Sequence, residues 1–317
     1  MTVTIWLASG ALPSAQDFLE VSADSPHQAE LAAYLDALVE QRCTRPEWWV
    51  VDGGSRAALW SLPGVEVPSH LVLIESDWDD PELAAGRALM ARVHELAAGL
   101  GADALEHMVD SPPVAPQHQE RPEERVALLE AAGYELVRDG LRWLLASPSE
   151  HVEPGPLTFR TIADVGEDAF VDAIAATFEG TADSELTLDV EQHGAREAAR
   201  RYLEDHESLE HRPEWFELAY VGDDLAGVIM GARNPTSAVI AYVGVVPEQR
   251  GRGLAAPLVR RGTARLAAAG ATEIRGDCDR DNVAMAKAFE RAGYAQFARR
   301  RSFRHSPLQQ AQARGTR

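Results

Sequence analysis

The sequence predicts an α/β protein of two domains, each a mixed sheet with helices on both faces. A chain of 317 residues is long enough for two domains of roughly 100–200 residues each. Apolar residues make up 45% and charged residues 25%, as in chains that pack ordinary cores. Helical and strand patterns alternate along the chain, and the two halves repeat the same order of segments.

The repeat is visible in matched glycines. Each half reads as a helix end, a glycine, a short strand, a helix, the tripeptide Ala-Gly-Tyr and two closing strands. Gly101 and Gly270 are 169 positions apart, whereas Gly133 and Gly293 are 160 apart. A longer Pro-rich connection in the first half, Ser111–Pro122, accounts for the difference. Duplication of one unit explains the pattern better than chance similarity of Ala-rich helices.

The boundary between the halves is predicted near Ser147–Pro156, where three prolines and a glycine break the periodicity. We therefore expect domains at 1–150 and 151–317. The first half carries 25 acidic residues and 9 arginines, a formal charge of −16, and the second carries 25 acidic and 21 basic residues, a charge of −4. An anionic cofactor is therefore expected in the second half.

Composition excludes several classes of protein. The net charge of −20 argues against a nucleic-acid binder, whose affinity depends on basic surface. No apolar run approaches the ~20 residues of a membrane span, and Met1–Ser14 lacks the basic start of a signal peptide. Cys43 and Cys278 give neither a disulfide framework nor a metal cluster, and the histidines lack metal-ligand spacing. We expect a cytoplasmic protein without a metal.

The second half is interpreted element by element. Asp164 is expected to cap a helix, and Gly222 to lie in a hairpin turn. The predicted strands are Leu157–Ile162, Trp215–Val221, Leu225–Arg233, Val239–Val246, Thr272–Asp277 and the closing strands of Tyr294–Phe303, and the predicted helices are Asp164–Phe178, Ala195–Glu204, Gly253–Ala269 and Asn282–Ala292.

The most informative stretch runs from Val243 to Val259. A strand enters Pro247, a turn follows with two glycines and two arginines, and an apolar helix begins. Glycines allow close approach of the backbone, and a helix start offers unpaired N–H groups that bind phosphate. Pro257 suits the first turn of that helix. An ordinary strand–turn–helix connection would explain the glycines but not the arginines.

Arg250-Gly-Arg-Gly253-Leu-Ala255 resembles the acyl-coenzyme A signature Gln/Arg-x-x-Gly-x-Gly/Ala of the GNAT superfamily of N-acetyltransferases. The element order from Leu157 to Phe303 is similar to that fold, and the resemblance covers most of the second half. It implies a tandem of two GNAT-like domains, each a mixed, mostly antiparallel sheet flanked by helices. It also implies acetyl-CoA as co-substrate, with its pantetheine arm between two central strands that splay apart.

The resemblance assigns the cofactor contacts residue by residue. Backbone groups of Val245 and Val246 would hold the pantetheine arm, and Asn282 would add a side-chain contact. Amides would hold the pyrophosphate at Arg250, Gly251, Arg252, Gly253, Leu254 and Ala255. The counterpart in the first half, Asp77–Gly86, has four acidic residues and no arginine before Gly86. The first half is therefore expected to be a degenerate copy without a cofactor.

The catalytic groups are less defined. The family often uses a tyrosine seven residues after the asparagine to protonate the thiolate, but here that position is Phe289. A thiol of pKa about 8.5 leaves tolerably without such an acid. Glu217 lies within a strand and Asp277 ends one, so each is a candidate base. Glu217 is otherwise an exposed strand residue, and Asp277 a turn or cap residue. Cys278 is expected to be a core residue and not a nucleophile.

The acceptor is expected to be a small amine. The segment Glu179–Glu191 forms one wall of the cleft in this fold, and it has five acidic and no basic residues. A cationic amine would suit that wall, although a solvated loop explains the charges equally well. Three functions remain open: an N-acetyltransferase of a small amine, a mycothiol synthase-like enzyme, and a non-catalytic acyl-CoA-binding or interaction module.

Overall fold

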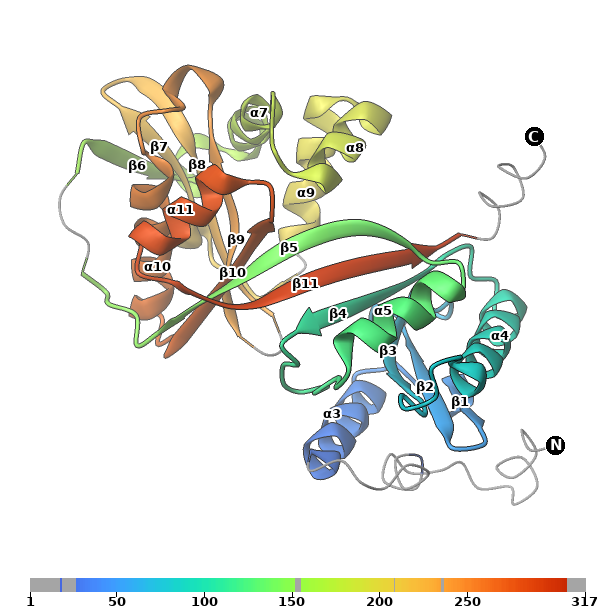
Figure 1. Cartoon of the computed structure of the whole chain (residues 1–317). Helices are drawn as coiled ribbons and strands as arrows, with labels where there is room; N and C mark the ends of the chain where they lie inside the picture. Colours follow the sequence, from blue (N-terminus) through green and yellow to red (C-terminus); the bar gives the residue numbers. More distant parts are fainter. Residues whose placement is uncertain (1–17, 19–26, 152–154, 208, 235–236, 307–317) are drawn as a thin grey trace. The chain divides into compact units, whose positions relative to one another are not determined.

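The computed structural model describes residues 18, 27–151, 155–207, 209–234 and 237–306 (Figure 1). The chain divides into two compact units. Unit 1 contains residues Met1–Asp139 and Ala298–Arg317, and unit 2 contains Gly140–Phe297. The units therefore differ from the two halves of the sequence, because the end of the chain belongs with the beginning.

Unit 1 is built on a five-stranded sheet in the order β1-β2-β3-β4-β11, in which β3 and β4 are parallel and the other pairs antiparallel. Its elements are α3 (Gln28–Glu40), the 3₁₀ turn η2 (Pro46–Trp48), β1 (Trp49–Asp52), β2 (Ser55–Trp60), β3 (His70–Glu75), α4 (Ala84–Gly99), β4 (Leu105–Ser111), α5 (Pro122–Ala131), the start of β5 (Glu135–Ala146) and most of β11 (Ala295–His305).

Unit 2 is built on the order β5-β10-β9-β8-β7-β6, in which β9 and β10 are parallel and the other pairs antiparallel. Its further elements are β6 (Leu157–Thr161), α6 (Ile162–Val165), α7 (Glu167–Phe178), α8 (Ser184–His193), α9 (Ala195–Glu207), η3 (Pro213–Trp215), β7 (Phe216–Val221), β8 (Asp224–Arg233), β9 (Ala238–Val245), η4 (Pro247–Gln249), α10 (Ala255–Ala268), β10 (Glu273–Asp279) and α11 (Val283–Arg291). The predicted α/β class with mixed, mostly antiparallel sheets is confirmed.

The two closing strands predicted in each half are one long strand in each, β5 and β11. Residues 295–305 contain no glycine, proline, asparagine or aspartate that would favour a turn. In β11, residues 299–305 pair with β4 of unit 1, and in β5, residues 140–146 pair with β10 of unit 2. By sequence, each unit then holds a net charge of −10: 24 acidic against 14 basic residues in unit 1, and 26 against 16 in unit 2. The charge asymmetry of the halves is absent from the compact units.

The internal repeat extends to backbone irregularities. A β-bulge leaves Val72 of β3 without a partner on β2, and another leaves Ala241 of β9 without a partner on β8. These two residues are 169 positions apart, which is the spacing of Gly101 and Gly270. The tetrapeptide Arg-Pro-Glu-Trp also occurs twice, and it forms a 3₁₀ turn before β1 in unit 1 and before β7 in unit 2. The structure therefore supports duplication.

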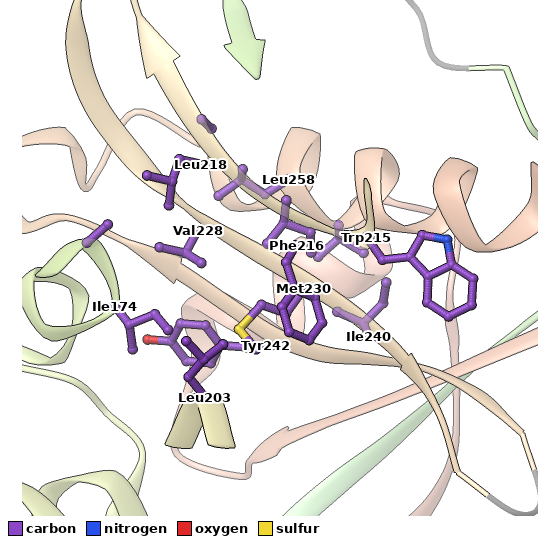
Figure 2. Packing of buried hydrophobic residues seen from close by; sticks show 14 of the residues in the cluster. Ile174, Leu203, Trp215, Phe216, Leu218, Val228, Met230, Ile240, Tyr242 and Leu258 are labelled. Atoms are coloured by element: carbon purple, nitrogen blue, oxygen red, sulfur yellow. The ribbon is translucent and has the colours of Figure 1, made fainter. Parts of the chain in front are cut away.

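The bulge in β9 changes which helices its residues contact. Ile240 lies against Gly262 of α10, whereas Tyr242 reaches Thr177 of α7 on the other side of the sheet. Residues two apart in a regular strand share a face, so the extra residue Ala241 is what turns Tyr242 over. Figure 2 shows the Tyr242 ring beside Ile174 and Leu203, apart from Trp215 and Leu258. Helices α7 and α9 thus cover one face, and α10 and α11 the other.

The helical predictions need two corrections. Asp164 does not cap α7; its carboxylate accepts from the backbone N–H of Thr161 at 2.8 Å, closing a capping box around the short α6. Segment Glu179–Glu191 is not simply a loop, because most of it forms α8, with Asp183 as N-cap and Leu186 buried. Among the described residues no helix is long and apolar enough to cross a membrane. The prediction about Met1–Ser14 lies outside the described residues.

His94 and Tyr134 of unit 1 hold the positions of Thr263 and Tyr294 in unit 2. Thr263 and Tyr294 share a hydrogen bond of 2.7 Å. In unit 1, His94 Nε2 and Tyr134 Oη are buried and have no hydrogen-bond partner among the described residues. Burial, helped by the stacked His305 ring at 4.0 Å, lowers the pKa of His94 to about 4.

We predict that His94→Thr stabilises unit 1, because threonine gives Tyr134 an acceptor worth about 1 kcal/mol. In the parent, the unfolded state binds more protons than the folded state between pH 6.5 and about 4, so the free energy of unfolding falls as the pH falls. After allowance for partial exposure, this loss is about 1–2 kcal/mol and should disappear in the variant. Urea unfolding at pH 7 and pH 5 measures both effects. The control is His151→Thr at an exposed position; an unchanged pH dependence in His94→Thr would contradict the prediction.

Candidate functional site

The candidate site begins where β9 and β10 part. The two strands pair only at Ala238–Ile274 and Val239–Arg275. Beyond Val239 the edge of β9 that faces β10 has no ladder partner among the described residues, and N–H groups on this edge are open to a ligand. Two carbonyls of this stretch are already used: Val245 O accepts from Arg250 Nε and Ala241 O accepts from the Tyr202 hydroxyl. The divergence expected from the resemblance is therefore present. Unit 1 has the same feature, since β3 and β4 pair at only two positions, His70–Glu106 and Leu71–His107.

The glycine-rich turn follows β9 directly. Gly251 and Gly253 have φ of +75° and +76°, values that glycine adopts at little cost. Within the part of the chain that the structure describes, the amides of residues 251–255 donate no hydrogen bond. Five unpaired N–H groups at the start of α10 form a site for an anion. Pro257 is the third residue of α10, in the first turn as predicted.

Val245 and Val246 differ in what they offer. Val246 donates its N–H to Ala226 O at 3.1 Å, and its carbonyl accepts from Gln249 N at 3.0 Å. Both backbone groups of Val246 are therefore used within the protein, and we do not assign it to a ligand. Val245 O accepts from Arg250 Nε at 3.0 Å, on the side of β9 away from β8. The N–H of Val245 lies on that same edge and can bind a ligand arm.

The motif arginines are bound within the protein. The Arg250 amide donates to Pro247 O at 3.2 Å, and its guanidinium contacts three backbone carbonyls. Arg252 contacts the side chain of Gln249. A third arginine, Arg291, lies near the turn and was not predicted to do so. Its Nη1 is 3.9 Å from the position that a Cβ atom at Gly253 would occupy. Its distance of 38 positions along the chain gives no sequence signal for this proximity.

Asn282 and Phe289 belong to the helix opposite the turn. Asn282 is the N-cap of α11, and its Oδ1 accepts from Met285 N at 3.1 Å, which leaves its NH₂ group for a ligand. Phe289 is buried, stacks on Trp143 at 5.8 Å and fills the space beside Gly276. Cys278 is buried and accepts from Trp143 Nε1 at 3.4 Å. Phe289 offers no proton, and the position of Cys278 fits a core residue.

Glu217 is an ion-pair residue under α10. Its side chain is 2% exposed, and its carboxylate accepts from Arg261 Nε and Nη2 at 2.8 Å and from Arg265 Nη2 at 2.7 Å. Two guanidinium groups pair with the carboxylate and occupy its oxygens. It lies on the α10 face of the sheet, whereas Tyr242 points to the α7 face. We therefore no longer assign Glu217 the role of base.

Asp277 and Asp279 lie on β10 beyond its last pair with β9. Asp277 is exposed and lies opposite Arg142 of β5 in the antiparallel register. Asp279 is buried and accepts from the N–H and Oγ of Ser184, at 2.9 and 2.7 Å. Asp279 thereby ties the start of α8 to the end of β10. Alternate residues of a strand share a face, so Asp277 also lies on the side of α8.

The acidic wall is partly structural. Asp183 caps α8 by accepting from Leu186 N at 3.0 Å, and Asp189 pairs with His193 at 3.5 Å. Glu179, Glu185 and Glu191 are exposed. Next to this wall, the buried Tyr242 hydroxyl meets Thr177 Oγ1 at 2.6 Å, and burial raises the pKa of Tyr242. Tyr242 is thus a neutral group at pH 7.

The corresponding region of unit 1 is filled by its own side chains. Before α4, Asp80 accepts from the amides of Glu82 and Ala84 at 3.0 and 2.9 Å. The buried Arg125 of α5 contacts Ile74 O of β3 and pairs with Glu75 at 2.6 Å. Gln119 links Arg125 at 3.4 Å to Met108 O of β4 at 3.1 Å. The helix start is capped and the gap between the strands is bridged.

One histidine cluster was not foreseen from the sequence. Ligand atoms of His27, Glu30 and His118 lie within 4.8 Å of one another, although His118 is far from the other two in sequence. The two imidazoles stack at 3.7 Å with planes 8° apart. Nitrogen lone pairs lie in the ring plane, so stacked rings do not direct them at one point. We assign no metal to this cluster.

Comparison with known proteins finds similarity to acetyltransferases. Residues 181–294 match the Acetyltransferase (GNAT) family. A protein named as an acetyltransferase from Sodalis glossinidius is 35% identical over 86 residues, 27% of this chain and 61% of the relative. The matched stretch thus spans less than two thirds of that protein.

Two solved structures share the fold. The structure of a GCN5-related N-acetyltransferase from Sphaerobacter thermophilus has a TM-score of 0.53 at 18% identity, covering 79% of this chain and 76% of that one. The structure of a GCN5-related N-acetyltransferase from Kribbella flavida has a TM-score of 0.52 at 16% identity, covering 90% of this chain and 97% of that one.

Proposed function

We propose, from the match of residues 181–294 to the Acetyltransferase (GNAT) family and from the geometry of unit 2, that this chain transfers an acetyl group from acetyl-CoA to a primary amine of a small cationic molecule. The observation that carries the proposal is the set of five unpaired amides at residues 251–255, placed directly after the open edge of β9. The helix start suits an anionic group, and the open edge of β9 suits an extended arm. A ligand with an anionic group at one end and an extended arm at the other would fit both.

The residues present fit acetyl-CoA. The amides of residues 251–255 would hold the pyrophosphate, with the charges of Arg252 and Arg291 beside them. The N–H of Val245 would hold the pantetheine arm, and the NH₂ group of Asn282 would add a contact. Acetyl-CoA supplies an activated thioester, and β9 offers a backbone N–H for the oxygen that becomes negative during attack.

In the proposed reaction the amine nitrogen attacks the thioester carbon directly. A C–N bond forms, the C–S bond breaks and the thiolate leaves. The proton lost by the amine passes to Asp277 or to a water that Asp277 orders. The thiolate takes a proton from water, because Phe289 has none to give. Asp277 is preferred over Glu217 because its carboxylate is exposed beyond the last pair of β9 and β10.

A second candidate is a non-catalytic acyl-CoA-binding module. The buried phenyl ring at position 289, where the family often has a tyrosine, favours this alternative. Release of free CoA thiol from acetyl-CoA and longer acyl-CoAs, measured with a panel of amines, separates the two. Thiol release that depends on the amine supports an enzyme. Tight binding without release for any amine supports the module.

We predict one acetyl-CoA per chain, bound in unit 2. Gly251→Asp places a carboxylate four residues before the start of α10, as Asp80 precedes α4, and it should weaken CoA binding at least about 100-fold by blocking the amides. Gly251→Asn is the control of equal size, and it should weaken binding less than about tenfold. Titration calorimetry measures both. Two equivalent sites per chain, or parental affinity in Gly251→Asp, would overturn the assignment.

We predict that Asp277→Asn lowers kcat/KM about 10–100-fold with the best amine, because the amide cannot accept the proton. Asp281→Asn is the control, since it removes a nearby exposed charge of the same sign. The measurement is the initial rate of thiol release at a fixed pH. A parental rate in Asp277→Asn would rule out Asp277.

The acceptor prediction concerns two acidic residues of α8, the exposed Glu185 and the half-buried Asp189. Neutralising Glu185 and Asp189 together should raise KM for a cationic amine several-fold at low salt, and the effect should shrink as ionic strength rises. Asp183 is left intact because it caps the helix. The control Asp223→Asn, Asp224→Asn removes two charges from the β7–β8 hairpin. If both double variants have equal KM values, or if the best acceptor is anionic, the acidic residues of α8 have no role in binding the amine.

A further inference from the structure

Arg250 is the first residue of the cofactor signature, yet its amide and each nitrogen of its guanidinium donate a hydrogen bond within the protein. Its amide donates to Pro247 O. Its Nε donates to Val245 O at 3.0 Å, Nη1 to Gly180 O at 3.2 Å and Nη2 to Thr177 O at 3.0 Å. Each nitrogen of the guanidinium thus meets a different backbone carbonyl.

The three carbonyls come from two segments that are distant in sequence. Val245 ends β9, the strand whose open edge leads into the glycine-rich turn. Thr177 and Gly180 lie at the end of α7, where helix carbonyls have no partner within the helix and attract a cation. Gly180 has a φ of +59°, and from it the chain runs four residues to Ser184, which Asp279 holds. Arg250 and Asp279 therefore anchor the two ends of the segment 177–184.

A lysine could not make the same set of contacts. Guanidinium presents several N–H groups in a rigid planar fork, whereas an ammonium is a single point of charge on a flexible stem. Three carbonyls from two segments match the fork. The charge of Arg250 would remain in a lysine variant, but the link between the segments would be lost.

We propose that Arg250 is a positioning residue: it fixes the acceptor-side segment 177–184 to the end of β9 and does not serve as a ligand of the pyrophosphate. This proposal rests on the proposed function, because it assumes that segment 177–184 holds the amine and that the Arg250 link places this amine beside the thioester arm. A displacement of the segment would misalign the amine and reduce the rate even when the cofactor is bound.

Three variants separate positioning from phosphate binding. Arg250→Lys keeps the charge and breaks the link. Arg252→Lys is the matched control in the same turn. Arg291→Gln removes a charge that faces the turn and has no part in the link. Each is assayed with acetyl-CoA and with S-acetylpantetheine, which carries the same thioester arm without the pyrophosphate.

For Arg250→Lys we expect a loss in kcat/KM of at least about tenfold with both thioesters and an affinity for CoA within about threefold of the parent. Any loss in Arg252→Lys should be confined to the CoA thioester, because Arg252 lies beside the proposed pyrophosphate site and has no part in the link. Arg291→Gln should lose rate and affinity with the CoA thioester only. Conversely, a loss in Arg250→Lys confined to the CoA thioester and to CoA affinity would make Arg250 a phosphate ligand and overturn the proposal.

Hydrogen–deuterium exchange tests the link without any activity. In Arg250→Lys, amides of residues 177–184 should exchange faster than in the parent and in Arg252→Lys, both with and without CoA. Gly180→Ala should do the same, because its methyl group would lie 3.3 Å from Arg250 Nη1, whereas a methyl group at Gly194, which also has a positive φ, would meet no atom within 4 Å. Parental exchange in Arg250→Lys would refute the link. If the parent releases no thiol with any amine, the proposed function fails, but the exchange result still decides the role of Arg250.

Discussion

The extra residue Ala241 in β9 is the constraint on which the site of unit 2 depends. It turns Tyr242 to the α7 face while Ile240 remains against α10, and β9 parts from β10 over the same residues. A sheet that continued its ladder would satisfy every N–H and C=O of β9 internally. The divergence instead leaves one edge of β9 open, directly before a turn whose amides are also unpaired. Local strand geometry thus creates both ends of a binding site.

Unit 1 has the same backbone geometry, with the bulge, the parting strands and the helix that follows them, but its own groups occupy part of the corresponding region. Asp80 accepts from the amides of Glu82 and Ala84, just before and at the start of α4, and Arg125 with Gln119 bridges β3 and β4. The same scaffold thus carries different local chemistry in the two units, so the fold alone does not identify a function.

Sequence reasoning worked where one local rule decides the outcome. Glycines of positive φ, Pro257 in a first turn and the repeated Ala-Gly-Tyr each have a local cause, and the turn and its helix were predicted from them. Sequence reasoning failed where contacts with residues distant in sequence determine the role of a side chain. Glu217 seemed a candidate base until α10 placed Arg261 and Arg265, one helical turn apart, on its carboxylate. Arg291 is distant in sequence from the turn, and Thr177 and Gly180 are distant in sequence from Arg250, which binds their carbonyls. Helix α8 was not predicted because its acidic composition is also typical of a solvated loop.

The net charges of the two units do not explain which unit would bind an anionic cofactor. The sequence halves suggested that an anionic cofactor would choose the second half for its smaller negative charge. The strand β11 removes this argument, because it carries arginines into unit 1, where Arg300 pairs with Asp110 and Arg301 with Glu123. With both units at −10, and with exposed charges screened beyond about 10 Å at 0.1 M salt, the long-range field does not distinguish them. What distinguishes them is local: a carboxylate occupies the helix start in unit 1, and unpaired amides remain there in unit 2.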